Sequence, residues 1–307
     1  MATGLDQISV CICTYKRPQT LAHLLNELER QVTENLFTYS AVVVDNDADK
    51  SAKETVEFWQ SKSSFPIDYF NEPEQNIALA RNKAVENAEG NYVAFIDDDE
   101  YPVVDWLLHL YKTVLSFKVD GVLGPVKPHY PDNVPKWLIK SKLCERPTYK
   151  TGTILHWGDT RTGNVLLKKE IFYNPKNRFD AEHGRTGGED VEFFKKMSEQ
   201  GKVFTWCDEA PAYEVVPPER WEKEFYTQKL LRIGGLVGEK IRKRDTFLKR
   251  IYSLIKSSGW IAVLSAFLPF AYLLGQHIYI RFITKIMYNY GLIAGYMGRT
   301  IIRYRNE

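Results

Sequence analysis

Four consecutive carboxylates, Asp97, Asp98, Asp99 and Glu100, follow directly on the apolar run 92–96. Their like charges repel one another, so placing them together at the end of a strand brings no structural gain. Either water solvates them as an acidic turn, or a cation binds there. Hard divalent cations prefer carboxylate oxygens and keep coordination positions for phosphate and water. A diphosphate bridged by such a cation becomes a better leaving group, so these acids are a candidate metal site.

A second acidic pair, Glu189 and Asp190, follows Gly187 and Gly188 where a helix is expected to begin. Glycines permit positive φ and close backbone approach. The two acids either stabilise the helix dipole or do chemistry. A carboxylate can act as general base when it lies within hydrogen-bond reach of a sugar hydroxyl. One acidic site for a metal and another for a base suit a displacement at a sugar carbon that carries a diphosphate.

Alternating strands and helices must position these acids. We expect strands in 8–15, 39–51, 67–73 and 91–100, and helices in 17–32, 51–62, 76–90 and 105–117. This alternation predicts an α/β layer with a largely parallel sheet. Ligands bind at the carboxyl ends of the strands in such sheets, and Asp45, Asp47 and 97–99 all fall at these ends.

The pattern changes after residue 120. Residues 121–141 are rich in Pro and Gly, which predicts an irregular surface excursion. Residues 162–172 indicate a short strand entering a helix or turn, and 183–201 a Gly-rich loop followed by a helix. A further strand is expected in 202–221. From about residue 219 the chain is expected to be helical.

Charge is distributed unevenly around a net value of +2. Residues 1–217 hold 25 Lys and Arg against 33 Asp and Glu (net −8), whereas 218–307 hold 16 against 6 (net +10). Such a basic segment favours contact with phosphate or an anionic surface. The four cysteines lack zinc-type spacing, so we interpret them as reduced core residues of a cytosolic protein. The first ten residues lack the pattern of a secretory signal.

The segment 257–280 has no charged side chain for 24 residues, which is long enough to cross a bilayer. Pro269 would kink such a span, and basic and aromatic residues near its edges suit the membrane interface. We therefore expect membrane contact, as a single span or as helices in the interface. A buried helical pair is the alternative.

The motifs in 8–18, 42–48, 76–100, 162–172, 187–197 and 214–221 together resemble a family 2 glycosyltransferase. In order and spacing, the chain is most similar over about 7–235 to bacterial exopolysaccharide enzymes of the succinoglycan type. The resemblance implies a GT-A fold: a Rossmann-like, mostly parallel mixed sheet flanked by helices. It also implies a nucleotide-diphospho-sugar donor, with UDP as the expected nucleotide, a divalent cation (Mn²⁺ or Mg²⁺) and inversion at the anomeric carbon.

The resemblance also assigns roles to residues. Asp190 is the catalytic base, and Asp99 of the D-x-D motif is a metal ligand. Many relatives carry a metal-binding His near 214–221, where this chain offers Tyr213 and Glu214, so Glu214 becomes the second candidate ligand. Arg220 is the candidate for the diphosphate. The implied acceptor-side residues are Glu189, Asn164 beside Gly163, and Trp157. The implied nucleotide-side residues are Thr14, Tyr15, Arg17, Asp45, Arg81, Asp97 and Asp98.

From this we expect a GT-A domain over 1–218, with a nucleotide-binding half (1–120) and an acceptor half (121–218). Residues 219–307 are expected to form a basic, apolar, helical membrane-associated extension. The expected activity is transfer of a sugar to a hydroxyl of a lipid-linked glycan, at the cytoplasmic face of a bacterial inner membrane, in surface polysaccharide synthesis. The alternatives are a polyprenyl-phosphate glycosyltransferase, a D-x-D phosphohydrolase and a non-catalytic cation-binding protein. No nucleic-acid partner is expected.

Overall fold

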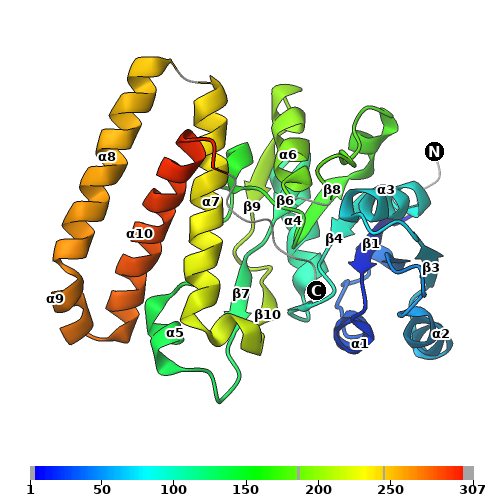
Figure 1. The fold of residues 1–307 in the computed structure, drawn as a ribbon. Coiled ribbons are helices and arrows are strands. Elements are labelled where there is room, and N and C mark those ends of the chain that lie inside the picture. The colour runs from blue at the N-terminus through cyan, green and yellow to red at the C-terminus, as the bar shows by residue number, and fades with distance from the viewer. Residues whose placement is uncertain (1–3, 185–186, 245, 300–307) are drawn as a thin grey trace. The chain divides into compact units, whose positions relative to one another are not determined.

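The computed structural model describes residues 4–184, 187–244 and 246–299 (Figure 1). The chain divides into two compact units. The first comprises Met1–Lys127 and Arg146–Glu214, and the second comprises Pro128–Glu145 and Val215–Glu307. The sequence placed a single boundary at residue 218, whereas this division falls at Glu214 and also assigns the stretch Pro128–Glu145 to the C-terminal unit.

The first unit is built on a seven-stranded sheet with the order β3-β2-β1-β4-β8-β6-β9. Strand β8 runs antiparallel to both neighbours, whereas β1 with β2, β1 with β4, β2 with β3 and β6 with β9 pair in parallel. The α/β fold with a mostly parallel mixed sheet is therefore confirmed. The strands are β1 (Asp6–Thr14), β2 (Phe37–Asp45), β3 (Ile67–Asn71), β4 (Tyr92–Phe95), β6 (Gly121–Leu123), β8 (Val165–Lys168) and β9 (Phe204–Trp206).

Helices cover both faces of this sheet. Alternate strand residues point to opposite faces, so Val43 packs in one hydrophobic cluster and its neighbour Val42 in the other. The cluster with Val43 contains α1 (Pro18–Leu28), α2 (Lys53–Lys62) and α4 (Trp106–Phe117). The cluster with Val42 contains α3 (Ile77–Asn87) and α6 (Glu189–Glu199). Because β1, β2 and β3 are parallel, their connections to the helices that follow them lie at one edge of the sheet, at the carboxyl ends of the strands. The acidic loop 97–99 follows β4, which is parallel to β1, and lies at this same edge.

Local sequence explains where these helices begin. Pro18 occupies the first position of α1, where its missing N–H costs nothing. The Asn76 side chain caps α3 by accepting hydrogen bonds from the N–H groups of Ala78 (3.0 Å) and Leu79 (3.4 Å). These starts agree with the helices expected from the sequence.

The expectation of an irregular excursion over 121–141 is wrong. This stretch contains β6, β7 (Val126–His129) and α5 (Lys136–Ser141). Gly121 lets β6 approach its neighbours, because a Cβ at this position would lie 2.5 Å from Leu167 Cδ2. The strands were missed because they are short and interrupted by Gly and Pro.

Among its described residues, the second unit also contains the helices α7 (Lys223–Arg244), α8 (Phe247–Ala266), α9 (Leu268–Leu273) and α10 (Gln276–Tyr296). Helix α10 packs along α7 and against α8 (Figure 1). The uncharged segment 257–280 is divided among α8, α9 and α10, since α9 begins just before Pro269. Within the described ranges, we find no helix with the length and apolar character needed to cross a membrane.

Candidate active site

The loop after β4 carries three of the four consecutive acids. It joins β4 to the short strand β5 (Glu100–Pro102) and lies beside the end of β1. Thr14 is the last residue of β1, and its hydroxyl donates a 2.7 Å hydrogen bond to Asp98. Asp98 is only 5% exposed, and this burial raises the pKa of its carboxyl to about 6 despite the hydrogen bond from Thr14. The buried Asp98 side chain therefore anchors this loop to the end of β1.

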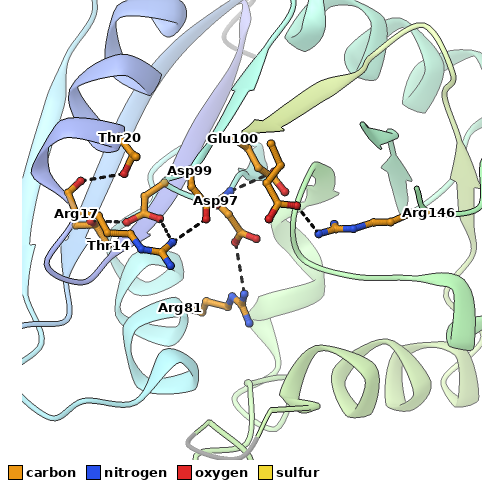
Figure 2. Close-up of polar contacts among 10 residues, drawn as sticks. Thr14, Arg17, Thr20, Arg81, Asp97, Asp99, Glu100 and Arg146 are labelled. Atoms are coloured by element: carbon orange, nitrogen blue, oxygen red, sulfur yellow. Dashed lines mark hydrogen bonds and ion pairs between the residues drawn. The ribbon is translucent and has the colours of Figure 1, made fainter. Parts of the chain in front are cut away.

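Arg17 supplies the positive charge at the front of this loop. Its Nη1 lies 2.8 Å from Asp99 Oδ2 and 3.2 Å from Asp98 Oδ1 (Figure 2). The Arg17 side chain is about half exposed, so these are contacts at the rim of the site. A cation that binds Asp99 must compete with this guanidinium.

Arg81 connects two acidic stations, which are the loop 97–99 and the pair Glu189 and Asp190 at the start of α6. It lies on α3 and is 8% exposed. Its Nη1 donates a hydrogen bond to Glu189, and its Nη2 lies 3.8 Å from Asp97 Oδ1 (Figure 2). Burial alone would lower the pKa of Arg81, but the Asp97 and Glu189 carboxylates raise it. Because the Arg81 side chain contacts both Asp97 and Glu189, the loop 97–99 and the start of α6 lie close together.

Helix α6 begins at this point of convergence. Gly187 and Gly188 have φ values of 80° and 102°, the left-handed region that favours glycine. Glu189 follows and is 6% exposed, and its Oε2 has no hydrogen-bond partner among the described residues. Asp190 is half-buried, and its Oδ1 accepts a 2.7 Å hydrogen bond from the N–H of Val191. Among the described residues, no ion pair engages the Asp190 side chain, and the hydrogen bond from Val191 uses only one of its two carboxylate oxygens.

A third group of charges borders the loop. Strand β10 (Ala212–Val215) runs antiparallel to β5 and places Glu214 opposite Glu100. Arg146 Nη2 lies 2.9 Å from Glu214 Oε2. Glu100 is buried, and this burial, followed by the nearby Asp97 charge, raises the pKa of Glu100 well above its ordinary value. Glu214, expected to bind metal, is thus engaged with Arg146.

Gly163 explains the close approach of the neighbouring loop. A Cβ at this position would lie 2.9 Å from Glu100 Oε1 and 3.1 Å from Asp97 Oδ2. Only glycine therefore lets the loop before β8 lie against the acids. Gly163 therefore lies next to Asp97 and Glu100, and its expected place beside the sugar stays a prediction.

Two polar residues expected to touch ligands make structural contacts within the fold. Asn164 is fully buried, and its side chain accepts from Trp106 Nε1 (2.7 Å) and donates to the carbonyls of Pro125 and Ala210. Asp45 is also fully buried and accepts hydrogen bonds from backbone N–H groups that include Ala52 (2.8 Å). Both side chains hold loops at the sheet edge and are fully buried, so their expected contacts with the acceptor and the nucleotide base stay predictions.

The remaining expected residues are dispersed. Tyr15 is 37% exposed next to Thr14. Trp157 lies in the short helix η1 (Trp157–Asp159), partly buried, with its ring 4.8 Å from that of His156. Arg220 belongs to the second unit, in η3 (Pro218–Trp221), where its guanidinium lies 5.9 Å from the Phe225 ring. Their expected contacts with sugar, nucleotide and diphosphate remain predictions.

Sequence reasoning missed Arg146, and it assigned Glu100 no role of its own. Glu100 was visible as the last of the four acids. Nothing in the local sequence marks Arg146, because its partner Glu214 is 68 residues away. Arg161 was missed too, although it directly precedes the loop that borders the acids. Its pKa is lowered by burial and by Arg146, while Glu100 and Asp190 oppose that shift.

The acidic loop fits a metal ion that is held partly by protein carboxylates and partly by the phosphates of the substrate. Within 4–184, 187–244 and 246–299, no three His, Cys, Asp or Glu residues form a ready metal cage. The loop nevertheless presents adjacent carboxylates, with Asp99 partly exposed at its front. Mg²⁺ and similar hard cations are commonly held by one or two carboxylates together with substrate phosphates. The donor set thus fits a cation that arrives with a diphosphate.

Residues 9–178 match the sequence pattern of glycosyl transferase family 2, and the chain belongs to this family. It is 31% identical over 297 residues to the succinoglycan biosynthesis protein ExoM of Rhizobium meliloti (strain 1021), covering 95% of this chain and 93% of that protein. The mixed sheet with flanking helices is consistent with the expected GT-A fold.

Solved structures also share this fold. The structure of S. aureus TarS 1-349 in complex with UDP-GlcNAc matches with a TM-score of 0.55 and 18% identity, over 95% of this chain and 92% of that one. The structure of GalNAc-T7 with UDP, GalNAc and Mn²⁺ matches with a TM-score of 0.53 and 14% identity, over 72% of this chain and 46% of that one. At these identities the likeness concerns the fold.

Proposed function

We propose that this protein is an inverting, metal-dependent hexosyltransferase that moves a sugar from a nucleotide diphosphate, with UDP favoured, to a hydroxyl of a lipid-linked glycan. The observation that carries the proposal is the convergence of the acidic loop and the start of α6 through Arg81. A surface polysaccharide is the favoured product, since ExoM, by its name, serves succinoglycan biosynthesis.

In the proposed reaction Asp190 accepts the proton of the acceptor hydroxyl. The resulting oxygen nucleophile attacks the anomeric carbon of the donor sugar and forms the new glycosidic bond. The bond between the anomeric carbon and the diphosphate oxygen breaks, and the nucleoside diphosphate leaves with the electron pair. Attack from the face opposite the leaving group inverts the configuration. Glu189, with its unpartnered Oε2, lies next to the base and can accept a hydrogen bond from the acceptor.

The metal would be held by Asp99, with Asp97 and Asp98 nearby, and it would neutralise charge on the departing diphosphate. Mn²⁺ or Mg²⁺ suits these oxygen donors. Glu214 serves this purpose only if Arg146 releases it, because the two already form an ion pair. In this proposal the nucleotide binds next to Thr14, Tyr15 and Arg17.

The direct test is a screen of nucleotide sugars for metal-dependent release of nucleoside diphosphate. We expect release with at least one UDP-sugar, its loss on chelation of the metal, and its loss in Asp99→Ala. Asp105→Ala is the matched control, because Asp105 is an acid outside the loop, paired with His109 on α4. Release that persists in Asp99→Ala, or that ignores chelation, would contradict the metal's role.

Arg17→Gln should strengthen the binding of Mn²⁺ to the ligand-free protein by about threefold to tenfold. The substitution removes a guanidinium that competes for Asp99, and exposed ion pairs of this kind contribute roughly 0.2–1 kcal/mol each. Electron paramagnetic resonance of free Mn²⁺ measures the affinity. Arg30→Gln, which breaks an exposed ion pair on the far end of α1, should leave the affinity unchanged. Equal affinities in wild type and Arg17→Gln would show that Arg17 does not compete with the metal.

We further propose that the protein works at the cytoplasmic face of a bacterial inner membrane, bound at the interface through α8 and α9. Apolar side chains of these helices are highly exposed, among them Tyr252 (68%), Ile255 (67%) and Leu273 (81%). Residues 246–306 contain no Asp or Glu, so anionic lipid would meet no repulsion there. A lipid-linked acceptor would share this surface with the enzyme.

The double variant Ile255→Glu with Leu273→Glu should bind vesicles containing phosphatidylglycerol at least about a hundredfold more weakly than wild type. Burying each of these side chains is expected to contribute roughly 1.5–3 kcal/mol. Flotation on a density gradient measures the bound fraction. Leu115→Glu, which changes an exposed leucine of α4 in the first unit, is the control and should bind as wild type does. Unchanged flotation of the double variant would exclude α8 and α9 as the contact.

A further inference from the structure

The packing of the C-terminal helices is uneven. Helices α7 and α10 meet backbone to backbone through glycines: a Cβ on Gly234 would lie 2.1 Å from the carbonyl oxygen of Tyr288, and one on Gly291 would lie 2.1 Å from that of Leu231. Small residues allow such close approach of two helices. This α7–α10 pair is therefore a tightly packed platform for its neighbours.

Helix α8 packs less closely on this platform. Side chains of α7, α8 and α10 line a cavity of about 450 Å³ between them. One part of the lining is apolar and includes Trp260 and Leu264. Another part is polar or cationic and includes Lys256, Lys285 and Asn289. The cavity thus combines a hydrocarbon-like wall with hydrogen-bond donors.

The two lysines lack negative partners. Neither Lys256 nor Lys285 forms a side-chain ion pair or hydrogen bond with any described residue. No acidic residue occurs anywhere in 246–306, so α8, α9 and α10 cannot supply one. On α7, the acid Glu239 is already paired with Lys243 at 2.8 Å. Two cations, with no acid among the described residues that line the cavity, favour an anionic ligand.

The cavity is also continuous with the exposed apolar surface of α8. Trp260 lines the cavity and is 51% exposed. Ile255, directly before Lys256, is largely exposed on the same helix. An anion with an attached hydrocarbon chain could place its charge at the lysines and its chain along this surface. A free anion would use only the polar half of the site.

From these observations we infer that the cavity between α7, α8 and α10 is a binding site for the phosphate head group of an anionic membrane lipid. Lys256 and Lys285 bind the phosphate, Asn289 donates a further hydrogen bond, and Trp260 and Leu264 contact the hydrocarbon next to it. The inference deepens the proposed interfacial binding and rests on it. Beyond non-specific attraction to anionic lipid, it predicts a defined site that binds one lipid per protein.

The test measures saturable binding of dihexanoyl phosphatidylglycerol to the full-length protein in solution by isothermal titration calorimetry, below the micelle concentration. Dihexanoyl phosphatidylcholine and inorganic phosphate are the comparison ligands. The site variant is Lys256→Ala with Lys285→Ala. The matched control is Lys240→Ala with Lys249→Ala, which removes two exposed lysines of α7 and α8 that do not line the cavity. Circular dichroism confirms that both variants are folded.

We expect one phosphatidylglycerol per protein. We expect the site variant to bind at least about tenfold more weakly than the control variant, because charge-assisted hydrogen bonds are lost only there. Equal weakening in both variants would overturn the inference in favour of diffuse surface attraction. Inorganic phosphate binding as tightly as the lipid, or phosphatidylcholine binding as tightly as phosphatidylglycerol, would overturn the lipid-phosphate assignment.

Vesicles distinguish the two sources of lipid phosphate. A phosphatidylcholine vesicle is supplemented either with phosphatidylglycerol or with a polyprenyl phosphate, and flotation of the site variant is compared with that of the control. A deficit on both supplements supports a general head-group site, and a deficit on the polyprenyl phosphate alone assigns the site to a lipid carrier. Failure of the transferase proposal is recognised separately, because metal-dependent diphosphate release by the wild type needs no vesicle.

Discussion

Asp190→Asn should lose nearly all glycosyl transfer, by about 10²–10⁴-fold in turnover, while the dissociation constant for the donor stays within about twofold of the wild-type value. The substitution keeps the shape of the side chain, and its amide oxygen can still accept the hydrogen bond from the N–H of Val191. What disappears is the ability to take a proton from the acceptor hydroxyl. Turnover at saturating acceptor and calorimetry with the donor measure the two quantities.

Glu192→Gln is the matched control for this experiment. Glu192 lies in the same first turn of α6, and its contact is an exposed ion pair with Lys195 at 3.5 Å. Removing its charge alters the field at the helix start to a similar extent, so an unchanged turnover there assigns the effect to Asp190 itself. A loss in Glu192→Gln comparable to that in Asp190→Asn would contradict a specific base.

The same variant separates the proposed reaction from its main alternative. A polyprenyl phosphate acceptor is already ionised, so its oxygen attacks without a base. Asp190→Asn would then keep nearly wild-type activity. Near-complete loss supports a hydroxyl acceptor, and family membership favours either transfer reaction over a phosphohydrolase or a non-catalytic cation binder.

The sequence predicted the framework because its signals are local. The run 8–15 becomes β1 and the acids 97–99 follow β4, as alternating apolar runs and turn residues indicate. The sequence also predicts one acidic site for a metal and another for a base, and in the structure Arg81 contacts a residue of each, Asp97 and Glu189. By contrast, β6 and β7 are too short, and too rich in Gly and Pro, to leave such a signal.

The details of the site depend on contacts between distant residues. Asn164 and Asp45 have the side chains that ligands require, but the same side chains satisfy buried backbone groups, and residue type alone does not separate the two uses. Arg81 was expected to contact the nucleotide. In the structure its guanidinium donates a hydrogen bond to Glu189, which is 108 residues away in the sequence. Only the folded chain determines which partner a buried charge selects.

Arg81 carries the largest expected effect on stability. Arg81→Met should lower the free energy of unfolding by about 3–5 kcal/mol, because it leaves the carboxylate of Glu189 buried without its cation. That is a large share of the 5–15 kcal/mol that is typical of folded proteins. Urea denaturation at neutral pH measures the change. Arg30→Met, which breaks an exposed ion pair with Glu27, is the control and should cost less than about 1 kcal/mol.

A second substitution separates the ion pair from simple packing. If the cost arises from the uncompensated carboxylate, Arg81→Met with Glu189→Met should recover most of the lost stability, since a buried pair replaced by apolar side chains of similar volume is often neutral. Activity should not recover, because the double variant no longer ties the start of α6 to Asp97. A double variant as unstable as Arg81→Met would mean that Arg81 acts through packing, for example against the Phe179 ring 5.8 Å away, and that the two acidic stations are held together by other contacts.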